Sequence, residues 1–101
     1  MINTKAIIKD INTAVKQFGE YNLYDKGMSE ILDYSSYTAD MKRMDPSELA
    51  KILVELLDTP IDKLNRDYAE YFITSALVFL DDMPDTYWNI LTKDVRILDL
   101  Y

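Results

Sequence analysis

The side chains that could do chemistry in this chain are carboxylates, hydroxyls and amines, because the sequence contains neither histidine nor cysteine. Ser–His and Cys–His nucleophiles and zinc-bound water are therefore excluded. Paired carboxylates can hydrolyse glycosides, but they need a substrate cleft between them, which a few short helices rarely enclose. The two glycines, Gly19 and Gly27, cannot build a glycine-rich phosphate loop. We therefore expect no enzymatic activity and no cofactor.

The carboxylates gather in the second half of the chain. Residues 67–92 contain five acids and six aromatic residues but no lysine or arginine. Residues 1–44 have six acids and six bases, whereas residues 45–101 have twelve acids and five bases and so carry the whole net charge of −7. Such asymmetry is informative about partners, and acids beside aromatic rings favour capture of a basic protein. The predicted contact residues are Asp67, Glu70, Tyr71, Asp81, Asp82, Asp85, Tyr87 and Trp88.

The run from Asp81 to Asp85 offers three oxygen ligands within five residues. A calcium loop of the EF-hand type needs alternating acids, a central glycine and a distal glutamate, and that pattern is missing. A helix junction explains the run better, because the helix dipole favours Asp85 at the start of a helix. Asp81 and Asp82 fall at a helix end that disfavours negative charge. We predict no metal site and interpret these two acids as serving a partner.

Six of the eight tyrosines form pairs three residues apart, which places both rings on one side of a helix. The pairs are Tyr21/Tyr24, Tyr34/Tyr37 and Tyr68/Tyr71. Tyr68 falls on an apolar stripe and is expected in the core. Tyr71 falls outside that stripe and is the better interface candidate.

Apolar periodicity predicts the first helices that position these residues. A helix over residues 4–18, with Asn3 or Thr4 as its N-cap, places one apolar face inward. That face consists of Ile7, Ile11, Ala14, Val15 and Phe18. A second helix is expected from Ser29 toward Met41.

Two cap-and-proline pairs predict the next helix starts. Asp45-Pro46 opens a third helix, and Thr59-Pro60 opens a fourth that continues to Asp81 or Asp82, with a possible break near residues 65–67. The third helix is expected to bury Leu49, Ile52, Leu53, Leu56 and Leu57 and to expose Glu48, Lys51 and Glu55. The expected inner stripe of the fourth helix is Ile61, Leu64, Tyr68, Phe72, Ala76 and Phe79.

A fifth helix is expected from Pro84 or Asp85 to about Lys93, and residues 95–101 form either a last helical turn or a strand. Two glycines and three prolines leave little room for hairpins. The prediction is a single all-α domain over residues 1–101, with about five short helices arranged as stacked helical hairpins or as an irregular bundle.

Composition also limits the location and the partners. No cysteine is present for disulfides, and the longest apolar run, residues 76–80, is too short to cross a bilayer. The chain start has no signal-peptide core. We therefore expect a cytoplasmic protein. The net charge of −7 disfavours direct contact with nucleic acid or an anionic membrane.

These observations favour a small acidic inhibitor of a basic, nucleic-acid-handling enzyme such as a nuclease toxin or a defence nuclease. The protein would act as immunity proteins and antitoxins do, or as a phage anti-defence protein such as an anti-CRISPR does. The alternative is a helical interaction module or subunit, which could self-associate as a homodimer, with Leu77, Val78 and Trp88 as its contact patch. A DNA-binding helix-turn-helix is disfavoured by charge, since only Lys5, Lys9 and Lys16 would support it.

Overall fold

The computed structural model describes residues 2–19, 34–59 and 62–101. Within these ranges the chain forms six α-helices and no strand, which confirms the all-α prediction. The helices are α1 (Thr4–Phe18), α3 (Tyr34–Arg43), α4 (Pro46–Asp58), α5 (Lys63–Phe79), α6 (Asp85–Leu91) and α7 (Val95–Asp99). The tail is thus a short helix, not a strand.

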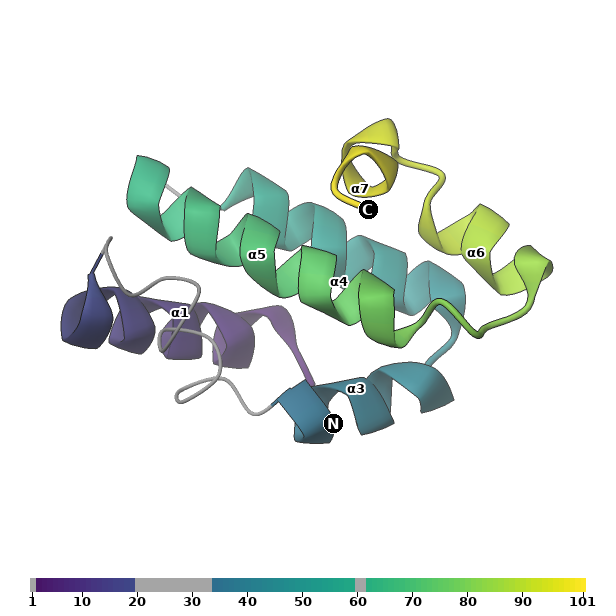
Figure 1. Cartoon of the computed structure of the whole chain (residues 1–101), viewed down its shortest axis with the longest axis horizontal. Helices are drawn as coiled ribbons and strands as arrows, with labels where there is room; N and C mark the ends of the chain where they lie inside the picture. Colours follow the sequence, from purple (N-terminus) through teal and green to yellow (C-terminus); the bar gives the residue numbers. More distant parts are fainter. Residues whose placement is uncertain (1, 20–33, 60–61) are drawn as a thin grey trace.

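The longest helix, α5, lies at the centre of the arrangement. It packs against α1, α3 and α4, and α4 also packs against α1 and α6. Figure 1 shows α4 and α5 running side by side, with α1 and α3 along one side of the pair and α6 and α7 on the opposite side. The helices cross at varied angles, so the fold is an irregular bundle.

Side-chain caps fix where four of the described helices begin. Asn3 accepts a hydrogen bond from the Ala6 N–H at 2.9 Å at the start of α1, as predicted. Asp45 accepts from the Ser47 N–H at 2.8 Å, with Pro46 at the first helical position of α4. Such caps satisfy backbone donors that have no partner within the helix.

The predicted start of α5 at Thr59-Pro60 is wrong. Thr59 still has helical backbone angles, and both its N–H and its hydroxyl donate to the Glu55 carbonyl, so it closes α4. The next helix begins at Lys63, where Asp62 accepts from the Asn65 N–H at 2.8 Å. From there α5 continues without a break to Phe79, two or three residues short of the expected end at Asp81 or Asp82.

The core forms where the apolar faces of the helices meet. Its largest fully buried side chains are Tyr68, Phe72, Ile7, Met41, Leu49, Leu53, Leu56, Ile73, Leu77 and Leu80. The Tyr68 hydroxyl donates to the Gly19 carbonyl at 2.7 Å and so ties α5 to the end of α1. Gly19 has φ +66°, a region that favours glycine, which suits its place directly after α1.

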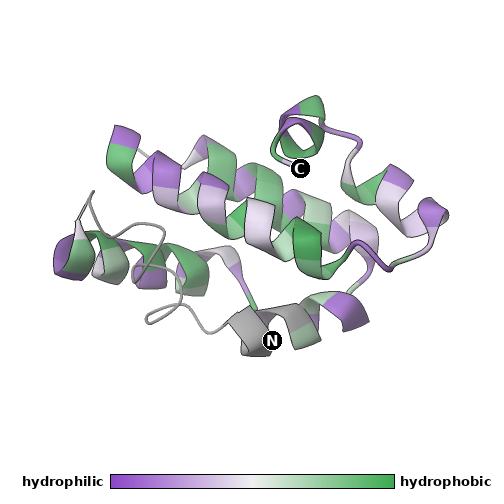
Figure 2. Cartoon of the chain, in the orientation of Figure 1, coloured by the Kyte–Doolittle hydropathy of each residue, from purple (hydrophilic) through white to green (hydrophobic). Residues whose placement is uncertain are grey.

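Several predicted core positions differ in the structure. Phe79 is 48% exposed although it continues the stripe of Phe72, and Leu77, which the interaction-module alternative placed in its contact patch, is fully buried. Five further side chains that were predicted to be buried are only half-buried: Val15, Phe18, Ile52, Leu57 and Leu64. Because α5 has neighbours on several sides, burial around it is wider than one stripe. Figure 2 shows α5 changing from polar residues at its N-terminal end to apolar residues at its C-terminal end.

Glu55 was predicted to be solvated but is half-buried. Its carboxylate accepts a hydrogen bond from the Thr4 hydroxyl at 2.7 Å, which joins α4 to the first turn of α1. The predicted start of the second helix at Ser29, the Tyr21/Tyr24 pair and Ile61 lie outside the described residues. That helix extends past Met41 to Arg43.

Candidate functional site

The eight predicted contact residues fall into two groups rather than one. Asp67, Glu70 and Tyr71 lie in the first half of α5, whereas the remaining five lie after its end and on α6. Nine residues separate Glu70 from Phe79, which is roughly 14 Å at 1.5 Å per residue. The two groups are therefore too far apart to form one compact cluster at the centre of an interface.

The group on α5 is half-buried and is not free of positive charge. Asp67, Glu70 and Tyr71 line a surface depression of about 450 Å³ together with Lys63 and Thr74. Lys63, just before the base-free segment in sequence, therefore contributes a cation to the same surface. This group is less suited to a basic partner than the sequence indicated.

The junction between α5 and α6 presents the other three carboxylates. Asp81, Asp82 and Asp85 are all exposed. Asp82 pairs with Lys42 of α3 at 3.4 Å, and both side chains are exposed, so the pair contributes little to stability. Asp81 and Asp85 form no ion pair with any residue in the described ranges. The fold thus leaves most of this negative charge uncompensated.

Tyr87, predicted as an aromatic contact, lies in the core instead. It is buried, and its hydroxyl donates to the Met41 carbonyl of α3 at 3.0 Å. Burial raises the pKa of the Tyr87 phenol, and the nearby negative charge of Asp45 adds to the effect. On α6 the neighbouring Trp88, rather than Tyr87, reaches the surface.

Trp88 is half-buried and holds three parts of the chain together. Its indole Nε1 donates to the Leu80 carbonyl at 2.7 Å, immediately after α5. Its ring meets the ring of Tyr101 edge to face, with centroids 5.1 Å apart. The aromatic group at this end of the molecule is therefore Trp88 with Tyr101.

Tyr101 was missed in the sequence because it follows a helix of only five residues. The signal was the three-residue spacing of Val95, Leu98 and Tyr101, which places neighbouring side chains along one flank of a helix. All three side chains are exposed, as is Val78 near the end of α5.

The charged groups on the other flank of α7 serve the fold. Arg96 binds Asp58 at the end of α4 at 2.7 Å and Asp94 at 3.0 Å. Asp94 also caps α7 by accepting from the Arg96 N–H. The hydrogen bonds from Arg96 lower the pKa of the Asp94 carboxyl and raise that of the guanidinium. These acids are committed to positioning α7.

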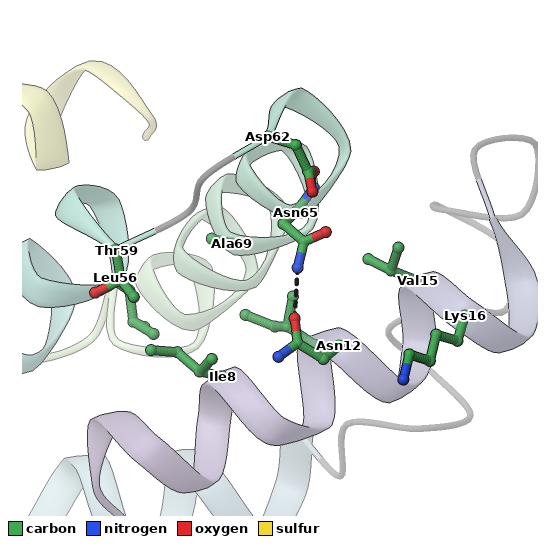
Figure 3. Close-up of a pocket in the computed structure, with 10 residues that line it drawn as sticks. Ile8, Asn12, Val15, Lys16, Leu56, Thr59, Asp62, Asn65 and Ala69 are labelled. Atoms are coloured by element: carbon green, nitrogen blue, oxygen red, sulfur yellow. Dashed lines mark hydrogen bonds between the residues drawn. The ribbon is translucent and has the colours of Figure 1, made fainter.

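A cavity of about 420 Å³ lies between α1 and the facing parts of α4 and α5. Figure 3 shows Ile8, Val15 and Leu56 around it and the Asn65 amide donating to Asn12 Oδ1. It contains none of the predicted contact residues. No ligand is assigned to this cavity.

Three further findings bear on the site. In the part of the chain that the structure describes, no group of three acidic side chains is arranged to hold a metal ion. None of the described helices is long and apolar enough to cross a membrane. No protein-family model matches the chain, and comparisons with curated proteins and with solved structures found no match either.

Proposed function

We propose that this protein is an acidic inhibitor that binds a basic, nucleic-acid-handling enzyme through the junction of α5 and α6. The supporting observation is that Asp81, Asp82 and Asp85 are all exposed at this junction. Among them only Asp82 forms an ion pair within the described residues, a weak, exposed one with Lys42. Acids that neither cap a helix nor hold a tertiary contact remain available to a partner.

Inhibition would occur by occlusion. The junction carboxylates pair with the lysine and arginine side chains that otherwise hold phosphate, and so compete with the nucleic acid. Complementary charge also accelerates encounter between the two proteins. No catalytic or metal-assisted step is needed, and direct binding of nucleic acid is opposed by the net charge of −7.

An immunity protein that neutralises a nuclease toxin and a phage protein that blocks a defence nuclease both fit this chemistry. We place the protein in the cytoplasm, because the chain has no cysteine and small secreted domains usually depend on disulfides. The second candidate is a self-associating helical module, favoured by the exposure of Val78. Leu77, which that alternative included in its patch, is in the core and unavailable.

The test begins with affinity capture of the partner from the source cell, its identification, and an assay of its activity on nucleic acid with increasing inhibitor. We expect a basic enzyme whose activity falls stoichiometrically. The triple variant D81K/D82K/D85K should keep its helical circular dichroism and slow association at least tenfold. The association rate of the unchanged protein should also fall steeply as ionic strength rises.

The matched control is K5E/K9E/K16E, which changes three charges on α1 and should leave inhibition unchanged. Loss of binding in this control, together with full binding by the aspartate variant, would overturn the proposal. The carboxylates would then serve solubility, and the partner would be acidic.

A further inference from the structure

Four apolar side chains from three helices and the chain end meet on one surface, here called the C-terminal apolar patch. Its members are Val78 of α5, Trp88 of α6, Leu98 of α7 and the terminal Tyr101. Val78 is 54%, Leu98 52% and Tyr101 60% exposed, while Trp88 is half-buried between them. Large apolar side chains gathered at this exposure mark an interaction site more often than isolated ones do.

One ring contact and two hydrogen bonds bring the parts of the chain that carry these side chains together. The rings of Trp88 and Tyr101 lie 5.1 Å apart, and the Tyr101 N–H donates to the Leu98 carbonyl. The Thr74 hydroxyl donates to the Leu100 carbonyl at 3.0 Å, which holds the chain end against α5. Val78 follows Thr74 by four residues and so lies one turn further along the same side of α5.

The opposite flank of α7 is occupied by its own fold contacts. Ile97 is buried, and Arg96 reaches Asp58 of α4. Leu98 and Tyr101 therefore cannot turn inward without breaking that attachment. The exposure of Leu98 and Tyr101 is thus a consequence of how α7 is docked.

Carboxylates surround this patch. Asp81 follows Val78 by three residues, and Asp85 precedes Trp88 by three, so each lies next to a patch residue. Asp99 directly follows Leu98 in sequence and is exposed. Within the described ranges none of these three acids forms an ion pair.

We infer that the C-terminal apolar patch is the docking centre for an amphipathic, basic helix of a partner protein, with its apolar stripe on the patch and its flanking lysines or arginines on Asp81, Asp85 and Asp99. An apolar centre with a charged rim is the usual anatomy of a protein interface, and an apolar helix face laid on such a surface is a recurring recognition mode. This inference rests on the proposed function in taking the partner to be basic.

Charge argues against the other occupants of the patch. A symmetric dimer would bring the same acidic rim from both copies together, and like charges across an interface are repulsive. An anionic membrane surface would be repelled for the same reason. A basic helix is the occupant for which both the centre and the rim are favourable.

The test uses the intact protein and two synthetic 14-residue helical peptides, one of leucine and lysine and one of leucine and glutamate in the same pattern. Trp88 is the only tryptophan, so its fluorescence reports directly on the patch. We expect a saturable blue shift with the leucine–lysine peptide and none with the leucine–glutamate peptide. The variants V78S and L98S, on two different helices, should each raise the Kd at least tenfold.

The control variant is I90S. Ile90 is 43% exposed on α6, but it follows Trp88 by two residues and therefore points to a different side of the helix. Its Kd for the leucine–lysine peptide should stay within twofold of the unchanged protein. Equal losses in I90S and L98S, equal binding of both peptides, or binding of neither would overturn the inference. So would a dimer in sedimentation equilibrium that L98S dissociates.

The outcomes separate this inference from the inhibitor function. If the captured enzyme is inhibited but neither peptide binds, the docking surface is wrong and the inhibitor function stands. If the leucine–lysine peptide binds at the patch but the captured partner is not inhibited, the docking surface stands and the inhibitor function falls.

Discussion

The two ends of α5 are both acidic, but they use their acids in different ways. At the N-terminal end Asp62 caps the helix, and Asp58, at the end of the adjoining α4, holds Arg96 of α7. At the C-terminal end Asp81 makes no ion pair in the described part of the chain, and Asp82 makes one exposed pair. The acids at the N-terminal end of α5 therefore stabilise the fold, whereas those at its C-terminal end remain available for recognition.

Helix polarity explains why the difference matters. A carboxylate at a helix N-terminus satisfies free N–H groups and is favoured by the dipole, whereas one at the C-terminus faces unsatisfied carbonyls. Asp62 occupies the favourable end and Asp81 the unfavourable one. Because Asp81 does not stabilise the fold at this position, binding to a partner is a natural explanation for a carboxylate there.

The strongest test of this contrast compares Phe72 with Phe79, the same residue type seven positions apart on α5. Phe72 is fully buried and Phe79 is 48% exposed. We expect Phe72→Ala to lower the free energy of unfolding by about 3–5 kcal/mol and Phe79→Ala by less than about 1 kcal/mol. Urea denaturation of both variants measures the difference. Equal losses would mean that the C-terminal end of α5 is as deeply packed as its middle.

A second, smaller test separates the two tyrosines near the α5–α6 junction. Tyr87→Phe removes the hydrogen bond to the Met41 carbonyl, but that carbonyl still accepts from the Met44 N–H at 3.2 Å. The loss should therefore be about 0.5–1.5 kcal/mol. Tyr101→Phe, on the exposed patch, should change the free energy of unfolding by less than that, and a reversed order would contradict the core assignment of Tyr87.

The burial of Tyr87 also predicts an effect at alkaline pH. Burial raises the pKa of Tyr87 in the folded protein above its ordinary value of 10, and Tyr68 is raised for the same reason. The neutral phenols contribute stability that is fully present below about pH 10 and is lost as pH rises through the folded pKa. Tyr87→Phe should therefore lose less stability between pH 9 and pH 12 than the unchanged protein, as measured by urea denaturation across that range.

Much of the fold was predictable because its signals are local. The spacing of Ile7, Ile11 and Ala14 predicted α1, and Asp45-Pro46 predicted the start of α4. The error at Thr59-Pro60 arose because a threonine before proline suits a helix end as well as a helix start. The true cap, Asp62, lay three residues further on.

The candidate site was less predictable because it depends on contacts between distant residues. The Lys42–Asp82 pair joins positions forty residues apart, and Tyr101 meets Trp88 across the whole of α7. Apolar periodicity identifies the face of a helix that packs inward, but it does not show how much of that face a neighbouring helix covers. Phe79 was therefore expected in the core, and Tyr87 was expected on the surface together with its neighbour Trp88.

The finest test exchanges single acids at the two ends of α5. Asp62→Ala removes the side chain that accepts from the Asn65 N–H and should lower the free energy of unfolding by about 1 kcal/mol. Asp81→Ala removes an exposed charge from the end that the dipole disfavours, so the change should stay within about 0.5 kcal/mol and be stabilising in sign. Thermal and urea denaturation at low salt resolve both values, and added salt should shrink the Asp81 effect because screening weakens the dipole interaction. A destabilising Asp81→Ala as large as Asp62→Ala would show that the fold also depends on the junction acid. The contrast between the two ends of α5 would then be lost, and the free carboxylates would no longer argue for a partner.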